Sequence, residues 1–240
     1  MADELTSSQV NKAGRILRHW LHSLDVDEPS TSERVRAALR VMFRFRAAHA
    51  YPLAKANNGL RSMIRSEGCA VEVSQRLKRA VTILNKLERE PSLALATMQD
   101  VGGCRALFES VAEVRRVEQR IRRNHPPIRI SDYIKRPRAS GYRAVHVVVQ
   151  YKDQQGVARA IELQLRTRTM HEWAIAVERL SGQRHEDLKS GAGPREIHDW
   201  LIAISEAMAI EEAGSTVPDL LAARIDALRA AAVPFFERVP

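Results

Sequence analysis

Two segments in the second half of the chain alternate polar and aliphatic side chains, the pattern of strands with two different faces. Residues 142–149 (YRAVHVVV) put Tyr142 and His146 on the same face as Ala144 and Val148, opposite three valines. Residues 160–166 (AIELQLR) put three polar side chains on one face, Glu162, Gln164 and Arg166. An aromatic ring, a carboxylate and a guanidinium on neighbouring strand faces predict the floor of a site for a charged ligand.

A second carboxylate lies upstream, where Asp100 opens the sequence DVGGCRALF. Its paired glycines, Gly102 and Gly103, permit a close approach of backbone or ligand at the start of a strand predicted over 104–108. The segment is neither a GKS/GKT P-loop nor a GxGxxG loop. Two carboxylates, Asp100 and Glu162, among basic side chains suit Mg²⁺, which prefers oxygen ligands and shares its coordination shell with substrate phosphates.

Basic side chains complete the predicted site, because phosphoryl-type transfer depends on positioning and on neutralising charge on oxygen atoms. The candidate phosphate clamps are Arg76, Lys78, Lys86, Arg105, Arg138 and Arg166. The ring of Tyr142 offers a face on which a base stacks, a contact of about 1–3 kcal/mol. His146 can hydrogen-bond a phosphate or a ribose, and a purely structural role is its alternative.

The charge of the whole chain agrees with an anionic ligand. Its 240 residues include 38 Lys and Arg against 29 Asp and Glu, a net charge of +9. A solvated arginine-rich surface is the alternative to a polyanionic partner. Because ten basic residues between Arg115 and Arg143 face only Glu118 and Asp132, we expect this run to bind phosphate.

Cysteine usage and hydropathy suggest a reducing compartment. Cys69 and Cys104 fit neither a zinc pattern nor a disulfide framework, and no segment is apolar enough for a signal peptide or a membrane span. We therefore expect a cytoplasmic protein without a membrane partner.

The remaining elements are predicted mostly from helical spacing of apolar residues. Helices are expected from Ser7 or Ser8 to Leu24, from Thr31 or Ser32 to Ala50, and through Leu60 to near Gly68, with Pro52 interrupting. A fourth is expected over 73–90, burying Leu77, Val81, Leu84 and Leu87. Later elements are a helix over 111–124, a strand over 128–130 and helices near 196–212 and 218–231. A helix with Met170, Trp173, Ala174 and Val177 should cover the aliphatic side of the sheet, and loops are expected over 25–32 and 181–194.

Three sequence blocks together resemble a known family. GYRAVH, preceded by DYIKRPR and followed by ELQLRT, resembles the synthetase domain of RelA/SpoT-type alarmone synthetases. SQRLKRAVTILNKL resembles the ATP-contacting basic helix of that family, and DVGGCRALF resembles its metal-binding strand. The blocks follow one another in the family's order within residues 73–180. The match of several blocks is more specific than a single motif.

The resemblance implies a mixed α/β fold: a central mixed β-sheet flanked by helices, in a nucleotidyltransferase-like synthetase domain. The expected organisation is a helical extension over 1–68, a pyrophosphokinase domain over 69–182 and a second helical extension over 183–240. It also implies a small, synthesis-only member of the family.

The implied reaction transfers the β,γ-pyrophosphate of ATP to a ribose 3′-hydroxyl, making (p)ppGpp when the acceptor is GDP or GTP. By resemblance, Asp100 and Glu162 hold Mg²⁺, with Glu162 also a candidate base. The residues implied to bind ATP are Arg76, Lys78, Lys86 and Arg105. Those implied to build the acceptor side are Arg138, Tyr142, His146, Gln164 and Arg166, with Tyr142 stacking on the base.

Three departures from the family pattern lie on or near the acceptor side: Ser131 in place of lysine, PRASGY in place of PKxNGY, and Arg179 after Glu178. They leave the acceptor open between a guanine nucleotide and the 3′-CCA end of tRNA, which toxic relatives modify. In the second case Arg120 and Arg123 should bind the RNA backbone. A non-catalytic RNA-binding module is a third reading, which the carboxylate pair disfavours. An antitoxin partner and a homo-oligomer also stay open.

Overall fold

The computed structural model describes residues 5–23, 32–184, 188 and 191–236 of the chain. A five-stranded sheet of strand order β1-β2-β5-β4-β3 forms its centre. The strands are β1 (Glu72–Leu77), β2 (Gly102–Phe108), β3 (Arg129–Asp132), β4 (Val145–Lys152) and β5 (Ala158–Thr167). Strands β2 and β5 are parallel, and the other neighbouring pairs are antiparallel. The predicted mixed sheet is confirmed.

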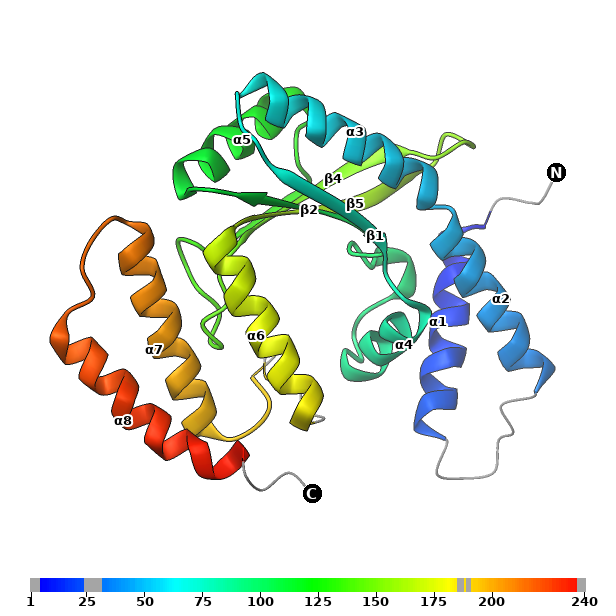
Figure 1. Ribbon diagram of the computed structural model, residues 1–240. Coiled ribbons are helices and arrows are strands. Elements are labelled where there is room, and N and C mark those ends of the chain that lie inside the picture. Colours follow the sequence, from blue (N-terminus) through cyan, green and yellow to red (C-terminus); the bar gives the residue numbers. More distant parts are fainter. Residues whose placement is uncertain (1–4, 24–31, 185–187, 189–190, 237–240) are drawn as a thin grey trace.

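Helices cover both faces of this sheet. They are α1 (Ser7–His22), α2 (Glu33–Ala47), α3 (Ala50–Ser66), α4 (Ala80–Arg89), α5 (Val111–Asn124), α6 (Arg168–Arg184), α7 (Arg195–Glu212) and α8 (Asp219–Phe236). Figure 1 shows α3 and α5 on one face and α4 and α6 on the opposite face. The pair α7–α8 lies beside α6, and the pair α1–α2 lies beside α4. Two ends of the chain thus flank one face of the sheet.

The main core lies between the aliphatic face of the sheet and helices α3 and α5. Val145, Val147 and Val149 of β4 are buried there with Ile161, Leu163 and Leu165 of β5. Val114, Val117 and Ile121 of α5 pack against them. The predicted alternation along β4 and β5 is therefore confirmed, because every second side chain of these strands points into this core. The polar side chains that alternate with them along β4 and β5 point to the opposite face of the sheet.

Two further hydrophobic clusters attach the terminal helices to the sheet. One joins α1 and α2 to α4 and to the segment around the short 3₁₀ turn Leu95–Thr97. The other joins α6, α7 and α8 to Tyr142 and Ala144. The domain boundaries predicted at 68 and 183 stay predictions, and these clusters cross both of them.

The helix predicted over 73–90 is wrong in its first half. Residues 72–77 form β1, which pairs antiparallel with β2, and α4 begins only at Ala80. This pairing satisfies the backbone groups that β2 would otherwise expose at an edge. The register of the helix changes as well: Val81 is 55% exposed, whereas Ile83 and Leu87 are buried.

The predicted position of α6 is also wrong. Trp173, Ala174 and Val177 are buried against Tyr142, Ala144 and α7, on the face of the sheet that carries the polar residues. The aliphatic face has no room for α6, because α3 and α5 already cover it.

Smaller corrections concern the ends of elements. Thr6, not Ser7 or Ser8, is the N-cap of α1, with a capping box to Gln9. Pro52 does not interrupt α3 but lies in its first turn, where proline is tolerated. Strand β4 begins at Val145, so Tyr142 and Ala144 precede it. Residues 24–31, and residues 185–187, 189 and 190 of the loop predicted over 181–194, lie outside the described residues. The loop prediction is wrong for 181–184, where α6 continues to Arg184.

The other predicted helices and strands are confirmed to within a few residues, including Ser32 as the N-cap of α2. Across the described part of the chain, no helix combines the length and hydrophobicity that crossing a bilayer requires.

Candidate functional site

Two rows of residues cross the polar face of the sheet. In the first row the paired positions from β3 to β1 are Arg129, Val148, Glu162, Gly103 and Arg76. In the second they are Ser131, His146, Gln164, Arg105 and Ser74. Paired positions in a sheet point to the same face. Because Gly103 has no side chain, the first row is open between Glu162 and Arg76.

A cavity of about 520 Å³ lies over these rows. Nine of the predicted site residues line it: Arg76, Lys78, Lys86, Asp100, Arg138, Tyr142, His146, Glu162 and Gln164. A second cavity of about 180 Å³ adds Arg105 and Gly103 to its lining. Asp100 and Glu162 line both cavities, so the fold brings together two carboxylates that are distant in sequence.

Asp100 is held between two lysines. It lies two residues before β2, and its Oδ2 and Oδ1 accept hydrogen bonds from Nζ of Lys78 at 2.9 Å and of Lys86 at 3.1 Å. Burial opposes ionisation of this carboxyl, but the two ammonium groups outweigh burial and lower the pKa of Asp100 below its usual value. Asp100 is therefore an anion at neutral pH.

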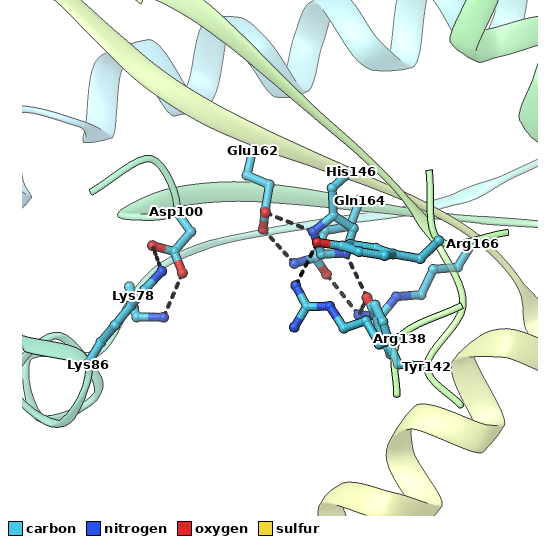
Figure 2. A network of polar contacts seen from close by, with 10 residues as sticks. Lys78, Lys86, Asp100, Arg138, Tyr142, His146, Glu162, Gln164 and Arg166 are labelled. Atoms are coloured by element: carbon cyan, nitrogen blue, oxygen red, sulfur yellow. Dashed lines mark hydrogen bonds and ion pairs between the residues drawn. The ribbon is translucent and has the colours of Figure 1, made fainter. Parts of the chain in front are cut away.

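Figure 2 shows Glu162 in a hydrogen-bond network separate from the one that holds Asp100. Its Oε1 accepts from Nδ1 of His146 at 2.9 Å and its Oε2 from Nε2 of Gln164 at 2.7 Å. Burial works against the anion, but hydrogen bonding and charge interaction with His146 lower the pKa of Glu162 from 4.5 to about 2. An ionised carboxylate only accepts hydrogen bonds, so Nδ1 of His146 carries a proton.

The network continues from His146 into the sheet. The Tyr142 hydroxyl lies 2.7 Å from Nε2 of His146 and accepts from Nη2 of Arg166 at 2.6 Å. Arg166 also donates to Oε1 of Gln164 at 3.1 Å. This chain of contacts fixes the ring of Tyr142 relative to both Glu162 and Gln164.

Tyr142 and Arg166 are more deeply buried than the sequence suggested, with 1% of each residue exposed. The Arg166 guanidinium lies 4.9 Å from the centroid of the Tyr142 ring, and the guanidinium of Arg138 lies 5.5 Å from it. Arg166 lines neither cavity. The structure therefore places Arg166 behind the predicted acceptor site, where it anchors Tyr142 and Gln164.

Several cavity residues lie outside the predicted set of site residues. Arg89, Gln99 and Tyr133 were not expected there, whereas Arg129 was expected only as part of the basic run and Ser131 only as a departure near the acceptor side. Tyr133 is the more accessible ring, with the Arg138 guanidinium 4.4 Å from its centroid and Arg138 Nη2 donating to its hydroxyl at 2.9 Å. Burial would raise the pKa of Tyr133, but the hydrogen bond from Arg138 helps to lower it. A test for strand alternation over 129–132 would have found Arg129 and Ser131.

Of the basic run 115–143, which we expected to bind phosphate, only Arg129 and Arg138 line the larger cavity. Helix α5 covers the opposite face of the sheet, and none of its residues lines either cavity. Arg115 pairs with Glu118 and Asp132 at 2.8 Å, and Arg122 pairs with Glu118 at 2.7 Å. These arginines are surface residues with carboxylate partners on the far side of the sheet.

The two carboxylates are candidate ligands for a magnesium ion. The described residues contain no group of three or more His, Cys, Asp or Glu side chains that could enclose a metal by itself. Mg²⁺ commonly takes only one or two protein carboxylates and completes its shell with water and substrate phosphates. Asp100 and Glu162 supply such a pair, both ionised and both lining the same cavities.

Comparison with known proteins identifies this region. The sequence profile of the region found in RelA/SpoT proteins matches residues 75–180, which contain both carboxylates and the β1–β5 sheet core. Residues 75–180 belong to the RelA/SpoT family.

Relatives of the RelA/SpoT region include the GTP pyrophosphokinase YjbM of Bacillus subtilis, 33% identical over 109 residues. This alignment covers 42% of the chain and 52% of YjbM. The GTP pyrophosphokinase of Escherichia coli K12 is 32% identical over 164 residues, which cover 62% of the chain and 21% of that protein. The chain thus spans about half of one relative and a fifth of the other.

The fold is also that of solved RelA/SpoT-family synthetases. The small alarmone synthetase 1 of Bacillus subtilis, bound to its product pppGpp, superposes with a TM-score of 0.61 at 25% sequence identity. The superposition covers 71% of this chain and 92% of that chain. A GTP pyrophosphokinase family protein of Streptococcus pneumoniae gives a TM-score of 0.58 at 26% identity, over 76% of this chain and 95% of the other.

Proposed function

We propose that this chain transfers the β,γ-pyrophosphate of ATP to the 3′-hydroxyl of GDP or GTP. The observation that carries the proposal is the joint position of Asp100 and Glu162, which line both cavities among basic side chains. A binding module gains nothing from two ionised carboxylates facing phosphates. A transferase that bridges phosphates through Mg²⁺ requires them.

The donor side of the proposed site lies over β1 and β2. Arg76 and Arg105 both line the smaller cavity, and guanidinium planes suit the faces of an adenine ring. The Nε atom of Arg105 is buried and has no hydrogen-bond partner among the described residues, so it is a candidate donor to a bound ligand. Lys78 and Lys86 beside Asp100 are placed to meet the triphosphate.

Asp100 and Glu162 would hold Mg²⁺, which supplies charge neutralisation to the phosphate oxygens during transfer. In this proposal the acceptor O3′ forms a bond to the β-phosphorus, the bond from that phosphorus to the oxygen bridging the α-phosphate breaks, and AMP leaves. The 3′-hydroxyl releases its proton to solvent in the same step. The low pKa of Glu162 suits an orienting and metal-binding role better than storage of that proton.

The acceptor side lies over β3, β4 and the segment before β4. Arg138, His146 and Gln164 line the larger cavity there, together with the two tyrosine rings. A base that stacks on Tyr142 has to displace the Arg138 guanidinium, whereas the ring of Tyr133 is already more accessible. The pppGpp-bound B. subtilis neighbour supports a guanine nucleotide as acceptor.

The test is a transfer assay with γ-labelled ATP and Mg²⁺, offering GDP, GTP and uncharged tRNA in separate reactions. We expect label in GDP or GTP, and loss of transfer in Asp100→Asn and Glu162→Gln. Glu172→Gln is the matched control, since it makes the same chemical change at an exposed position of α6. Label in tRNA alone would move the acceptor to RNA, and transfer to none of the three would overturn the proposal.

A further inference from the structure

Helix α7 contacts the segment Arg138–Arg143. This segment carries two residues of the proposed acceptor side, Arg138 and Tyr142. The hydroxyl of Ser205 donates to the carbonyl oxygen of Gly141 at 2.6 Å. Gly141 has a φ of +85°, and a Cβ placed there would lie 3.2 Å from Cα of Ile202 and 3.2 Å from Cβ of Ser205. The backbone of this segment therefore lies directly against the helix, at a position that only glycine fits.

A buried ion pair makes a second connection between α7 and the same segment. Arg143 Nη1 lies 2.8 Å from Glu212 Oε2, and their side chains are 10% and 9% exposed. The other carboxylate oxygen of Glu212 accepts a hydrogen bond from the Thr167 hydroxyl at the end of β5. Glu212 thus ties the C-terminal end of α7 to the acceptor segment and to the strand that carries Glu162 and Gln164.

These contacts act on the cavity through Tyr142, which lies between Gly141 and Arg143. The turn itself is held by backbone hydrogen bonds from Gly141 to the Arg138 carbonyl at 2.8 Å and from Arg138 to the Tyr142 carbonyl at 3.1 Å. Trp173 of α6 packs against the Tyr142 ring and donates to the Leu201 carbonyl of α7 at 3.1 Å. Moving α7 away therefore frees both the backbone and one side of the ring.

We propose that Ser205 and Glu212 are positioning residues that fix the acceptor-binding segment Arg138–Arg143 from α7. The inference rests on the proposed function, since it takes this segment as the acceptor side. It extends the site beyond residues 75–180, the part matched by the RelA/SpoT profile. Figure 1 shows α6 between α7 and α4, the helix that carries Lys86 of the proposed donor side.

Steady-state kinetics of Ser205→Ala and Glu212→Gln provide the first test, with ATP and GDP varied in turn. We expect KM for GDP to rise about tenfold, which corresponds to a loss of about 1.4 kcal/mol of binding free energy. KM for ATP should stay at the wild-type value. Glu206→Gln is the matched control, because Glu206 lies on the same helix and pairs with Arg224 of α8 at 3.5 Å. Its KM values should equal those of the wild type.

Hydrogen–deuterium exchange of the same variants provides a readout that does not need turnover. Amides of residues 138–144 should exchange faster in Ser205→Ala and Glu212→Gln, while β1 and β2 keep wild-type protection. Equal rises in both KM values, or faster exchange throughout the sheet, would show a merely structural role and overturn the inference. If the wild type transfers nothing to GDP, the proposed function is wrong. Unchanged exchange of residues 138–144 in the variants would separately contradict the inferred positioning role of Ser205 and Glu212.

Discussion

At the scale of single residues, the ionisation of the Glu162 carboxyl group depends strongly on the surrounding fold. His146 and Gln164 bind its two oxygens, and the pKa falls from 4.5 to about 2 despite burial. A group whose folded-state pKa is depressed stabilises the protein above its unfolded pKa. That stabilisation disappears as the pH falls through the folded-state pKa.

We therefore expect Glu162 to contribute about 3 kcal/mol of stability at neutral pH, at 1.36 kcal/mol for each pKa unit. The contribution should fade between pH 4.5 and about 2. Urea unfolding of wild type and Glu162→Gln at several pH values measures it. The difference in unfolding free energy between the wild type and Glu162→Gln should become smaller as the pH falls through this range. A difference that does not change with pH would contradict the lowered pKa of Glu162.

Residue types identified much of the site, but not the depth at which each residue lies. Asp100 and Glu162 stood out because carboxylates among basic residues point to metal and phosphate, and both line the cavities. Arg166 follows the same alternation as Glu162 but is buried beneath Tyr142. Arg166 contacts the Tyr142 ring, which packs in one hydrophobic cluster with α6, α7 and α8, and no local pattern reveals that packing.

At the scale of elements, α1 supports the donor side as α7 supports the acceptor side. Arg18 of α1 donates to the carbonyl oxygens of Leu87 at 2.7 Å and Leu93 at 2.5 Å, where α4 ends and the next segment begins. Gly14 permits this approach, because a Cβ there would lie 2.8 Å from Cβ of Leu95. Lys86 on α4 is thereby fixed beside Asp100.

Arg18→Ala should destabilise the protein by about 1–3 kcal/mol, because it leaves carbonyl groups at the end of α4 without a donor. It should also raise KM for ATP and leave KM for GDP unchanged, the reverse of the α7 variants. Thermal unfolding and the kinetic assay measure both effects. Arg15→Ala, an exposed position on the same helix, is the control. If Arg18→Ala raises KM for ATP and KM for GDP equally, α1 does not act on the donor side alone.

The elements that sequence reasoning misplaced are those decided by long-range partners. The sequence pattern of residues 72–77 is compatible with the helix that follows them, but these residues form a strand because they pair with the edge of β2. In contrast, α5, β4 and β5 were predicted well because their periodicity is strong and each buries one face in the same core. Local signals fail where a neighbouring strand competes for the backbone.

At the scale of the whole molecule, the chain has a net charge of +9, and its basic side chains lie in different surroundings on the two faces of the sheet. The cavity face gathers basic side chains around two ligand-facing carboxylates, whereas several arginines of α5 are neutralised by acids on the far face. Only the first arrangement concentrates potential where a nucleotide would enter.

Charge reversal at one residue of each surface tests this division. Arg129→Glu, in the larger cavity, should raise KM for the nucleotide acceptor and flatten its salt dependence, because a screened attraction has been removed. Arg123→Glu makes the same charge change on α5 and should alter neither quantity. Equal effects of the two reversals in a titration with NaCl would show that net charge alone matters.

The two supports of the site come from opposite ends of the chain. Arg18 lies in the first helix and Ser205 and Glu212 in the next-to-last one, while the carboxylates they serve lie between them. Changes in one terminal helix can therefore alter recognition of one substrate and spare the other. In evolutionary terms, the proposed function would allow such a chain to exchange its acceptor without rebuilding the residues proposed to hold ATP.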